Sequence, residues 1–201
     1  MKETGIVILD EVENCPYLDG ESARMPLRMP LKKLTPEGID QLLYDGNRRT
    51  GEFIYQTQCA SCRACEPIRI VSHEYKFSKN QRRLINRGDR KFTQRFGPLC
   101  CDETRLNLFN KHRKLRGLAK NDLDIDAEEY TWGFVRSCFD SFEITYWLED
   151  RLVCLSVCDL GQTSLSAVYT FFDTDFHADG LGTYSILKQI ELCQRRSIDH
   201  L

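Results

Sequence analysis

The stretch FEITYWLEDRLVCLSVCDLGQTSLSAVYTFFDTD, residues 142–175, decides the fold of this chain. It contains three β-rich runs, FEITYWLED, RLVCLSVCDLG and SLSAVYTFFDTD, which are separated by turn residues and predict three successive strands. The next segment, GLGTYSILKQIELCQRRS at 180–197, has the apolar spacing of a long amphipathic helix. The final residues, IDHL, are typical of the opening of another strand. We therefore expect a sheet domain in the C-terminal half.

Two helices are expected before these strands, ETRLNLFNKHRKLRG at 103–117 and AEEYTWGFVRSC at 127–138. The order helix, helix, three strands, helix, strand predicts an α/β (α+β) fold. We place a domain boundary near residue 100, in the turn GPLCCDE. This divides the chain into a small Cys-rich domain, 1–100, and a sheet domain, 101–201.

The N-terminal third is rich in loops, and its expected elements are short. Thr35 as N-cap and Pro36 at the first helical position predict a helix that ends at Gly46. Ser78 predicts the start of a second helix, which we expect to close at Gly88. The expected strands lie in GNRRTGEFIYQ at 46–56, EPIRIVSHEY at 66–75 and KFTQRFGP at 91–98.

Composition places the chain among ordinary globular proteins. It has 201 residues, of which 41% are hydrophobic and 29% charged. No apolar run approaches the roughly 18 residues that a membrane span needs. The start, MKETGIVILD, lacks the apolar region of a secretory signal. We therefore expect a cytoplasmic protein.

The net charge of −2 hides a basic block and an acidic block. Residues 76–95 hold eight Lys/Arg and one Asp, whereas 119–150 hold nine Asp/Glu and two Lys/Arg. The basic block is either a solvated helix face or a surface for nucleic-acid phosphates. Composition leaves both interpretations open.

Five segments carry a resemblance over most of the chain. They are CPYLDGESARMPLRMPL (15–31), LLYDGNRRTGEFIYQTQCASCRACEPIRI (42–70), FSKNQRRLINR (77–87), LSAVYTFFDTD (165–175) and LGTYSILKQI (181–190). In this order they resemble the arginyl-tRNA–protein transferase family, and most of all its bacterial aspartate/glutamate leucyltransferase branch.

The resemblance implies an aminoacyltransferase. Such an enzyme moves an amino acid, here leucine, from aminoacyl-tRNA to the N-terminus of proteins that begin with Asp or Glu, and so marks them for degradation by the N-end rule. The same reaction with Arg-tRNA stays open. The resemblance also implies a GNAT-like acyltransferase domain, preceded by a Cys-rich domain, with no cofactor for the chemistry.

The chain departs from the family pattern at two points. Gly117 follows Arg116 where the family often has a His, so any role of that His is in doubt here. The family also continues past the last helix with a further strand. We therefore expect that the chain is truncated at its C-terminus and that its sheet domain is incomplete.

The acceptor's acidic side chain requires cations, and arginine suits bidentate carboxylate recognition. The predicted acceptor-binding residues are Arg48, Arg49, Arg82 and Arg83. The donor's phosphates require a second set of cations and a Gly-rich helix N-terminus. The predicted tRNA-binding residues are Lys79, Arg87, Arg90, Lys91, Gly180 and Gly182. Generic surface charge is the alternative for each cation.

The reaction itself needs positioning, oxyanion stabilisation and a proton acceptor. Thr183 and Tyr184 supply hydroxyl groups near the helix N-terminus, and Asp173 can hold the incoming ammonium or accept its proton. We therefore predict these three as catalytic residues. The alternative for Asp173 is a turn-forming aspartate after a strand.

Ten cysteines occur, and three of them form CASCRAC at 59–65. Zinc and iron–sulfur sites are typically held by four thiolates. The predicted metal ligands are Cys59, Cys62 and Cys65, with Cys15 as the fourth because it lies in a segment that the family shares. Zinc and an iron–sulfur cluster both stay open. Reduced, unliganded cysteines packed under a loop are the alternative.

Two other classes of protein compete with the transferase. A non-catalytic, metal-dependent nucleic-acid-binding module would use the same cysteines and basic block, but would not need the C-terminal sheet domain. An acetyl-CoA-dependent GNAT enzyme would need Arg or Gln ahead of its glycines, and FHADGLG at 176–182 has neither at the usual place.

Overall fold

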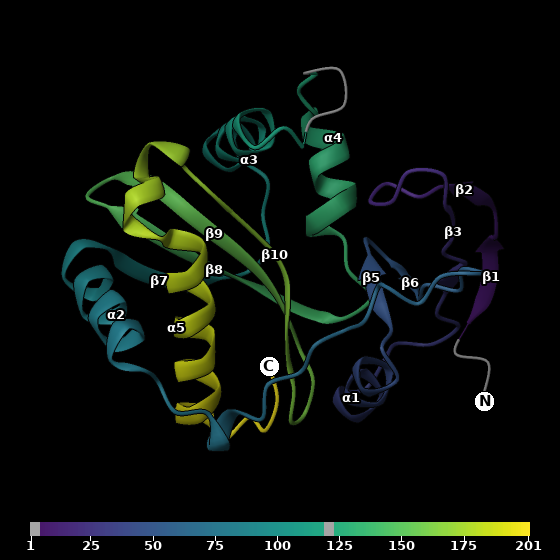
Figure 1. Cartoon of the computed structure of the whole chain (residues 1–201), viewed down its shortest axis with the longest axis horizontal. Helices are drawn as coiled ribbons and strands as arrows, with labels where there is room; N and C mark the ends of the chain where they lie inside the picture. The colour runs from purple at the N-terminus through teal and green to yellow at the C-terminus, as the bar shows by residue number, and fades with distance from the viewer. Residues whose placement is uncertain (1–4, 119–122) are drawn as a thin grey trace.

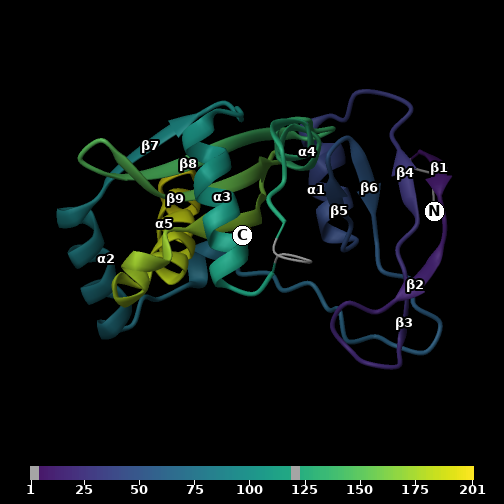
Figure 2. The same ribbon diagram turned by 90° about the horizontal axis from the view of Figure 1, so that it is seen from above.

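Figures 1 and 2 show two sheets side by side with helices packed against them. This computed structural model describes residues 5–118 and 123–201. Two short segments lie outside the described residues. Residues 1–4 begin the segment that we expect to lack a secretory signal, and residues 119–122 begin the acidic block. Within the described ranges, no helix has the length and apolar character needed to cross a membrane.

The N-terminal part forms a small antiparallel sheet with the strand order β1-β4-β6-β5. Its strands are β1 (Ile6–Leu9), β4 (Leu27–Met29), β6 (Phe53–Tyr55) and β5 (Arg48–Thr50). A two-stranded ribbon, β2 (Val12–Asn14) with β3 (Ser22–Arg24), extends from it.

Helix α1 (Pro36–Tyr44) begins as the sequence predicts. The Thr35 side chain accepts a hydrogen bond from the Gly38 N–H at 3.1 Å, and Pro36 occupies the first turn, where its missing N–H costs nothing.

The C-terminal part forms a larger antiparallel sheet with the order β10-β9-β8-β7. Its strands are β7 (Thr93–Gly97), β8 (Asp140–Leu148), β9 (Arg151–Leu160) and β10 (Leu165–Phe172). The three strands predicted within 142–175 are therefore confirmed. The long helix that follows them, α5 (Leu181–Arg196), is confirmed as well.

Central strand β9 is buried on both faces, which explains its nearly continuous apolar sequence. Alternate residues point to opposite faces of a strand. Ser156 lies against α5, where its hydroxyl is 2.5 Å from that of Ser185. Leu155 and Val157 belong instead to the core around Phe109 on the other face.

Helices cover the two faces of the larger sheet (Figures 1 and 2). Helix α5 lies on one face with α2 (Lys79–Lys91) packed beside it, and α3 (Glu103–Leu115) and α4 (Ala127–Tyr130) lie on the other. This arrangement confirms the predicted α/β (α+β) class, and the order of two helices, three strands and a helix agrees with the order expected of the C-terminal domain.

Two predicted boundaries are wrong. Helix α2 does not close at Gly88 but continues for three residues. Gly88 serves close packing instead, because a Cβ there would collide with the Tyr184 ring. In the expected helix 127–138, only Ala127–Tyr130 is α-helical, and a π-helical turn, Thr131–Val135, follows it.

The strand predicted at 66–75 does not form. This segment is irregular apart from a 3₁₀ turn, Ser72–Glu74. Its main chain bonds to the last residues of the chain instead, since Ile70 and Leu201 exchange two hydrogen bonds of 2.7 and 3.0 Å. His200, in the expected opening strand, forms only isolated bridges to Val71 and Ser164.

Helix α2 and strand β7 precede residue 100, yet they belong to the larger sheet and its helical layer. β7 pairs with β8 along Thr93–Gly97, and α2 packs on α5. A division that follows this packing lies between the irregular segment around 66–75 and α2, and we propose it in place of a boundary at residue 100.

A buried ion pair joins the two sheets. The Arg49 side chain, on β5, and the Asp159 side chain, on β9, are only 1% and 2% exposed, and Arg49 Nε lies 2.8 Å from Asp159 Oδ1. Ser141 donates a further hydrogen bond of 2.6 Å to the same carboxylate. Burial raises the pKa of Asp159, while the Arg49 charge opposes that rise.

A second contact fixes α1 against the β9–β10 turn. The Asp40 carboxylate accepts hydrogen bonds of 2.9 Å from the Thr163 N–H and from the Thr163 hydroxyl, and it also binds the Ser164 hydroxyl. Gly161 is required in this turn, because a Cβ there would collide with the Asp40 carboxylate. Phe139 packs beside these contacts against Ile39.

We expect Arg49→Met to lower the free energy of unfolding by about 3–5 kcal/mol at pH 7, because it leaves the Asp159 charge buried without a partner. The loss should shrink toward pH 4, since Asp159 of the variant gains a proton there. Urea denaturation at both pH values measures this. Arg48→Met, an exposed change on the same strand, is the control and should shift stability by about 0.5 kcal/mol or less. Equal effects of the two changes would contradict the interpretation.

Candidate functional site

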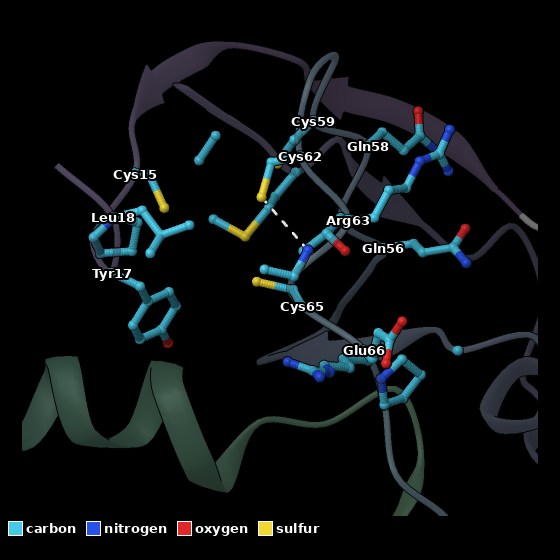
Figure 3. A pocket seen from close by; sticks show the side chains of 18 of the residues that line it. Cys15, Tyr17, Leu18, Gln56, Gln58, Cys59, Cys62, Arg63, Cys65 and Glu66 are labelled. Carbon is cyan, nitrogen blue, oxygen red and sulfur yellow. Dashed lines mark hydrogen bonds between the residues drawn. The ribbon is translucent and has the colours of Figure 1, made fainter. Parts of the chain in front are cut away.

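The four predicted metal ligands come together at one pocket of about 520 Å³ (Figure 3). Cys15 follows β2, and Cys59, Cys62 and Cys65 lie in the loop after β6. Two hydrogen bonds hold this loop near the β2–β3 turn. Gln58 N–H donates to the Arg24 carbonyl at 2.8 Å, and the Ser61 hydroxyl donates to Glu21 at 3.2 Å.

The arrangement of these thiols does not fit a metal site as it stands. Among residues 5–118 and 123–201, no three Cys, His, Asp or Glu side chains are placed so that they could hold one metal ion. All four cysteines are free and partly exposed. The sequence thus predicted which cysteines gather, while metal binding stays a prediction.

The same pocket carries charged and aromatic side chains. Arg48 and Arg63 line it together with Tyr17, Tyr44 and Glu66. Of the four arginines predicted to bind the acceptor, Arg48 is the one in this pocket. A guanidinium group suits a carboxylate ligand because it can donate two parallel hydrogen bonds.

The four predicted acceptor arginines do not share one pocket. Arg49 is buried in the ion pair with Asp159, so a ligand could reach it only if that pair opened. Arg82 and Arg83 lie on α2, at the left edge of the molecule in Figure 1, whereas β5 lies in the small sheet on the other side of the larger sheet. Arg82 donates to the Phe77 carbonyl, and the Arg83 side chain is exposed.

The predicted tRNA-binding residues, in contrast, are neighbours. Lys79, Arg87, Arg90 and Lys91 are all exposed on α2, which packs against α5. Arg87 donates hydrogen bonds of 3.4 and 3.3 Å to the carbonyls of residues 178 and 179, and Lys91 lies 2.7 Å from the Asp179 carboxylate. Residues 178 and 179 directly precede Gly180.

Gly180 and Gly182 shape the start of α5. Gly180 has a φ of +65°, a left-handed conformation that glycine adopts without strain. Its carbonyl accepts the first helical hydrogen bond, from the Tyr184 N–H at 2.8 Å. The N–H groups of residues 181–183 therefore precede the helical ladder and are positioned to bind an anion.

The three predicted catalytic residues have different environments. Thr183 is exposed in the first turn of α5. Tyr184 is buried, and its hydroxyl donates to Asp89 at 2.7 Å; burial and this bond raise its pKa. Of the two hydroxyl groups, only that of Thr183 is exposed to a substrate without rearrangement.

Asp173 lies in a buried clamp rather than in an open pocket. Lys111 Nζ lies 2.6 Å from Asp173 Oδ1, and Arg151 binds Oδ2. Burial acts to raise the pKa of Asp173, but the hydrogen bonds from Lys111, the Asp175 N–H and Arg151 outweigh it and lower the pKa. A carboxylate with a lowered pKa is a weak base, so this geometry favours a role in holding the turn before α5.

Sequence reasoning missed the partners of these residues. Lys111 on α3 and Arg151 at the start of β9 lie far from Asp173 in the sequence, and so does Asp159 from Arg49. Charge pairs of this kind leave no local pattern. The one available signal was the polar Asp159 at the end of an otherwise apolar strand.

The sequence matches two family models in succession. Residues 13–83 match the model described as Arginine-tRNA-protein transferase, N terminus, and residues 104–201 match Arginine-tRNA-protein transferase, C terminus. Together the two models cover most of the chain.

Curated relatives named aspartate/glutamate leucyltransferase align over nearly all of the chain. The Acinetobacter baylyi protein is 31% identical over 94% of this chain and 69% of its own length. The Thiobacillus denitrificans protein is 34% identical over 94% and 78%, and the Campylobacter jejuni protein is 28% identical over 100% and 84%.

A solved structure, described as the structure of L-PGS from Bacillus licheniformis, superposes with a TM-score of 0.52. The match covers 95% of this chain and 66% of that chain at 11% identity, so it is a likeness of fold.

We expect Asp173→Asn to lower the free energy of unfolding by about 1–3 kcal/mol at pH 7, because charge-assisted bonds to Lys111 and Arg151 are lost. The folded-state pKa of Asp173 is lowered, so this contribution is present above the unfolded pKa and disappears as pH falls through the folded pKa. The difference from wild type should therefore vanish in acid. Urea denaturation from pH 7 downward measures it, and Asp175→Asn, at an exposed position, should have a smaller effect. A deficit that persists in acid would contradict this account.

Proposed function

Because this chain belongs to the arginine-tRNA-protein transferase family, it is an aminoacyltransferase, and we propose that it transfers leucine to proteins that begin with Asp or Glu. The observation that carries the proposal is the alignment, over 94% of the chain, with relatives named for leucyl transfer to aspartate and glutamate. The two family models, in order along the chain, support aminoacyl-tRNA as the donor. Family membership removes the main support for a non-catalytic nucleic-acid-binding module.

The proposed reaction joins the acceptor's α-amino nitrogen to the ester carbonyl of aminoacyl-tRNA. An amide bond forms, the ester bond to the ribose breaks, and the ribose hydroxyl leaves with a proton. The α-amine has a reference pKa of about 7.7–8.0, so a fraction of it is neutral at pH 7. Positioning and charge stabilisation are therefore the main tasks of the protein.

Residues at the start of α5 are suited to the developing oxyanion. The N–H groups of Gly182 and Thr183 precede the first helical hydrogen bond, and the Thr183 side chain is exposed beside them. A side chain at position 182 would press on the Phe172 ring, since its Cβ would lie 3.3 Å from a ring carbon. Glycine thus keeps the strand end and the helix start close together.

The acceptor's carboxylate is proposed to bind Arg48. This side chain is exposed and lines the cysteine pocket, unlike its buried neighbour Arg49. Marking for degradation by the N-end rule would follow from leucine addition. Aminoacyl-tRNA is a cytoplasmic donor, and we propose the same compartment for this reaction.

We expect radiolabelled leucine to pass from Leu-tRNA to peptides that start with Asp or Glu, but not to peptides that start with Ala. Arg-tRNA, tested in parallel, decides between the two donors. At subsaturating peptide the rate should rise with pH up to about 8, as the amine loses its proton. No transfer from either aminoacyl-tRNA would overturn the proposed function.

Arg48→Gln should raise the KM for Asp and Glu peptides by about tenfold to a hundredfold with little change in kcat, because it removes a charge-assisted hydrogen bond of about 1.5–3 kcal/mol. Arg196→Gln, at an exposed position at the C-terminal end of α5, is the matched control. An unchanged KM in Arg48→Gln would exclude Arg48 from acceptor binding.

The metal site at Cys15, Cys59, Cys62 and Cys65 is also kept as a proposal, supported by the convergence of these cysteines on one pocket. A bound zinc ion or iron–sulfur cluster would fix the loop after β6 and would play a structural part. Elemental analysis should find metal in the wild type and in Cys138→Ala, and almost none in the Cys59→Ser, Cys62→Ser double variant. Metal retained by the double variant would exclude this ligand set.

A further inference from the structure

A groove of about 400 Å³ on the exposed side of α2 has a lining rich in arginine. It is lined by Asn80, Arg83, Leu84, Asn86, Arg87 and Arg90. Its three arginines are four and three residues apart, so they lie on one face of the helix. They form a row of cations along the groove.

This row is not neutralised by the protein. Arg87 donates to the main-chain carbonyls of residues 178 and 179, and Arg90 donates to the Asn86 carbonyl. Among the residues that the structure describes, none of the three arginines forms an ion pair with a carboxylate. Three guanidinium groups in a row repel one another, and a ligand with regularly spaced negative charges would relieve that repulsion.

The nearby carboxylates are bound elsewhere. Asp89, on α2 itself, accepts a hydrogen bond from Tyr184 and pairs with Lys188 at 3.0 Å. Asp179 pairs with Lys91 at 2.7 Å. Because both carboxylates are already paired, they do not form ion pairs with the arginines of the groove. The groove therefore keeps a positive local charge.

The opposite side of α2 is packed, and this argues for RNA rather than a membrane. Ile85 and Gly88 are buried, with Ile85 in the core beside Leu187 and Gly88 against the Tyr184 ring. A helix that inserts into a bilayer surface needs an exposed apolar face, and α2 has already buried its own. Arginine and asparagine side chains along a groove match a phosphate backbone.

The groove leads to the start of α5. Arg87, the middle arginine of the row, bonds to the carbonyls of residues 178 and 179, so the middle of the row lies beside the N–H groups proposed to bind the oxyanion. A strand whose phosphates contact these arginines would pass beside that turn. The arginines of the row would thus fix the position of the donor RNA relative to the start of α5.

We propose that Arg83, Arg87 and Arg90 bind backbone phosphates of the donor RNA next to its aminoacylated 3′ end. Arg83, which the sequence assigned to the acceptor, then belongs to the donor surface. This inference rests on the proposed function for the identity of the RNA, but not for the binding itself.

The test is the salt dependence of RNA binding. The probe is a fluorescent RNA hairpin with a tRNA acceptor stem and a single-stranded 3′ end, titrated with the full chain at about 50 to 200 mM salt. Each lost phosphate contact lowers the slope of log Kd against log salt by about 0.7 on single strands and 0.9 on duplex. Arg83→Gln, Arg87→Gln and Arg90→Gln should each show that decrease, and the triple variant about three times as much.

Arg195→Gln, at the far end of α5, removes the same charge and should leave the slope unchanged. Unchanged slopes in the triple variant would overturn the proposal. A rise in the acceptor KM of Arg83→Gln with normal RNA binding would overturn the assignment of Arg83. Arginine-dependent binding to vesicles of acidic phospholipid without RNA binding would also overturn it. Arginine-dependent RNA slopes without leucine transfer would support this inference while the proposed function fails.

Discussion

The ion pair between Arg49 and Asp159 is the contact on which the relation between the two sheets depends. Both charges are out of water, and an unpaired charge there would be costly. The pair therefore holds β5 against the end of β9, and Asp40 fixes α1 on the adjacent turn. With both contacts made, the small sheet and the larger sheet keep a defined relation (Figure 1).

The second constraint is the close packing of α2 on α5. Gly88 lets the Tyr184 ring approach the α2 backbone, and the Tyr184 hydroxyl then reaches Asp89. The exposed row of arginines on α2 is consequently held beside the first turn of α5. The proposed donor surface at α2 and α5 and the proposed acceptor pocket around Arg48 lie on different parts of the molecule, on the larger sheet and beside the small sheet. The side-chain carboxylate and the α-amine of the acceptor belong to one residue, so binding at Arg48 and reaction at the start of α5 require these two parts of the molecule to approach each other.

Much of the fold could be predicted because its signals are local. Alternating and continuous apolar runs within 142–175 specified three strands, and Thr35 and Ser78 specified two helix starts. The failures have physical causes that are not local. The apolar residues at 66–75 predicted a strand, but that segment pairs with the chain's last residues, and Gly88 is a packing glycine rather than a helix end.

For the site, the sequence identified which cysteines and which α2 cations gather. It could not separate Arg48 from Arg49, because only the partner on β9 distinguishes the exposed arginine from the buried one.

The contact between Asp40 and Thr163 spans 123 residues of sequence, and this has a consequence for synthesis. At about 5–20 residues per second, a ribosome needs roughly 6 to 25 s to supply Thr163 after Asp40 has been made. Throughout that interval Arg49 on the small sheet lacks Asp159 and Asp40 on α1 lacks Thr163, while the apolar residues of α1 can pack on Ile54 but lack Phe139. The nascent N-terminal third therefore carries a cation without its buried partner and an incomplete apolar cluster around α1 until the C-terminal half has been made.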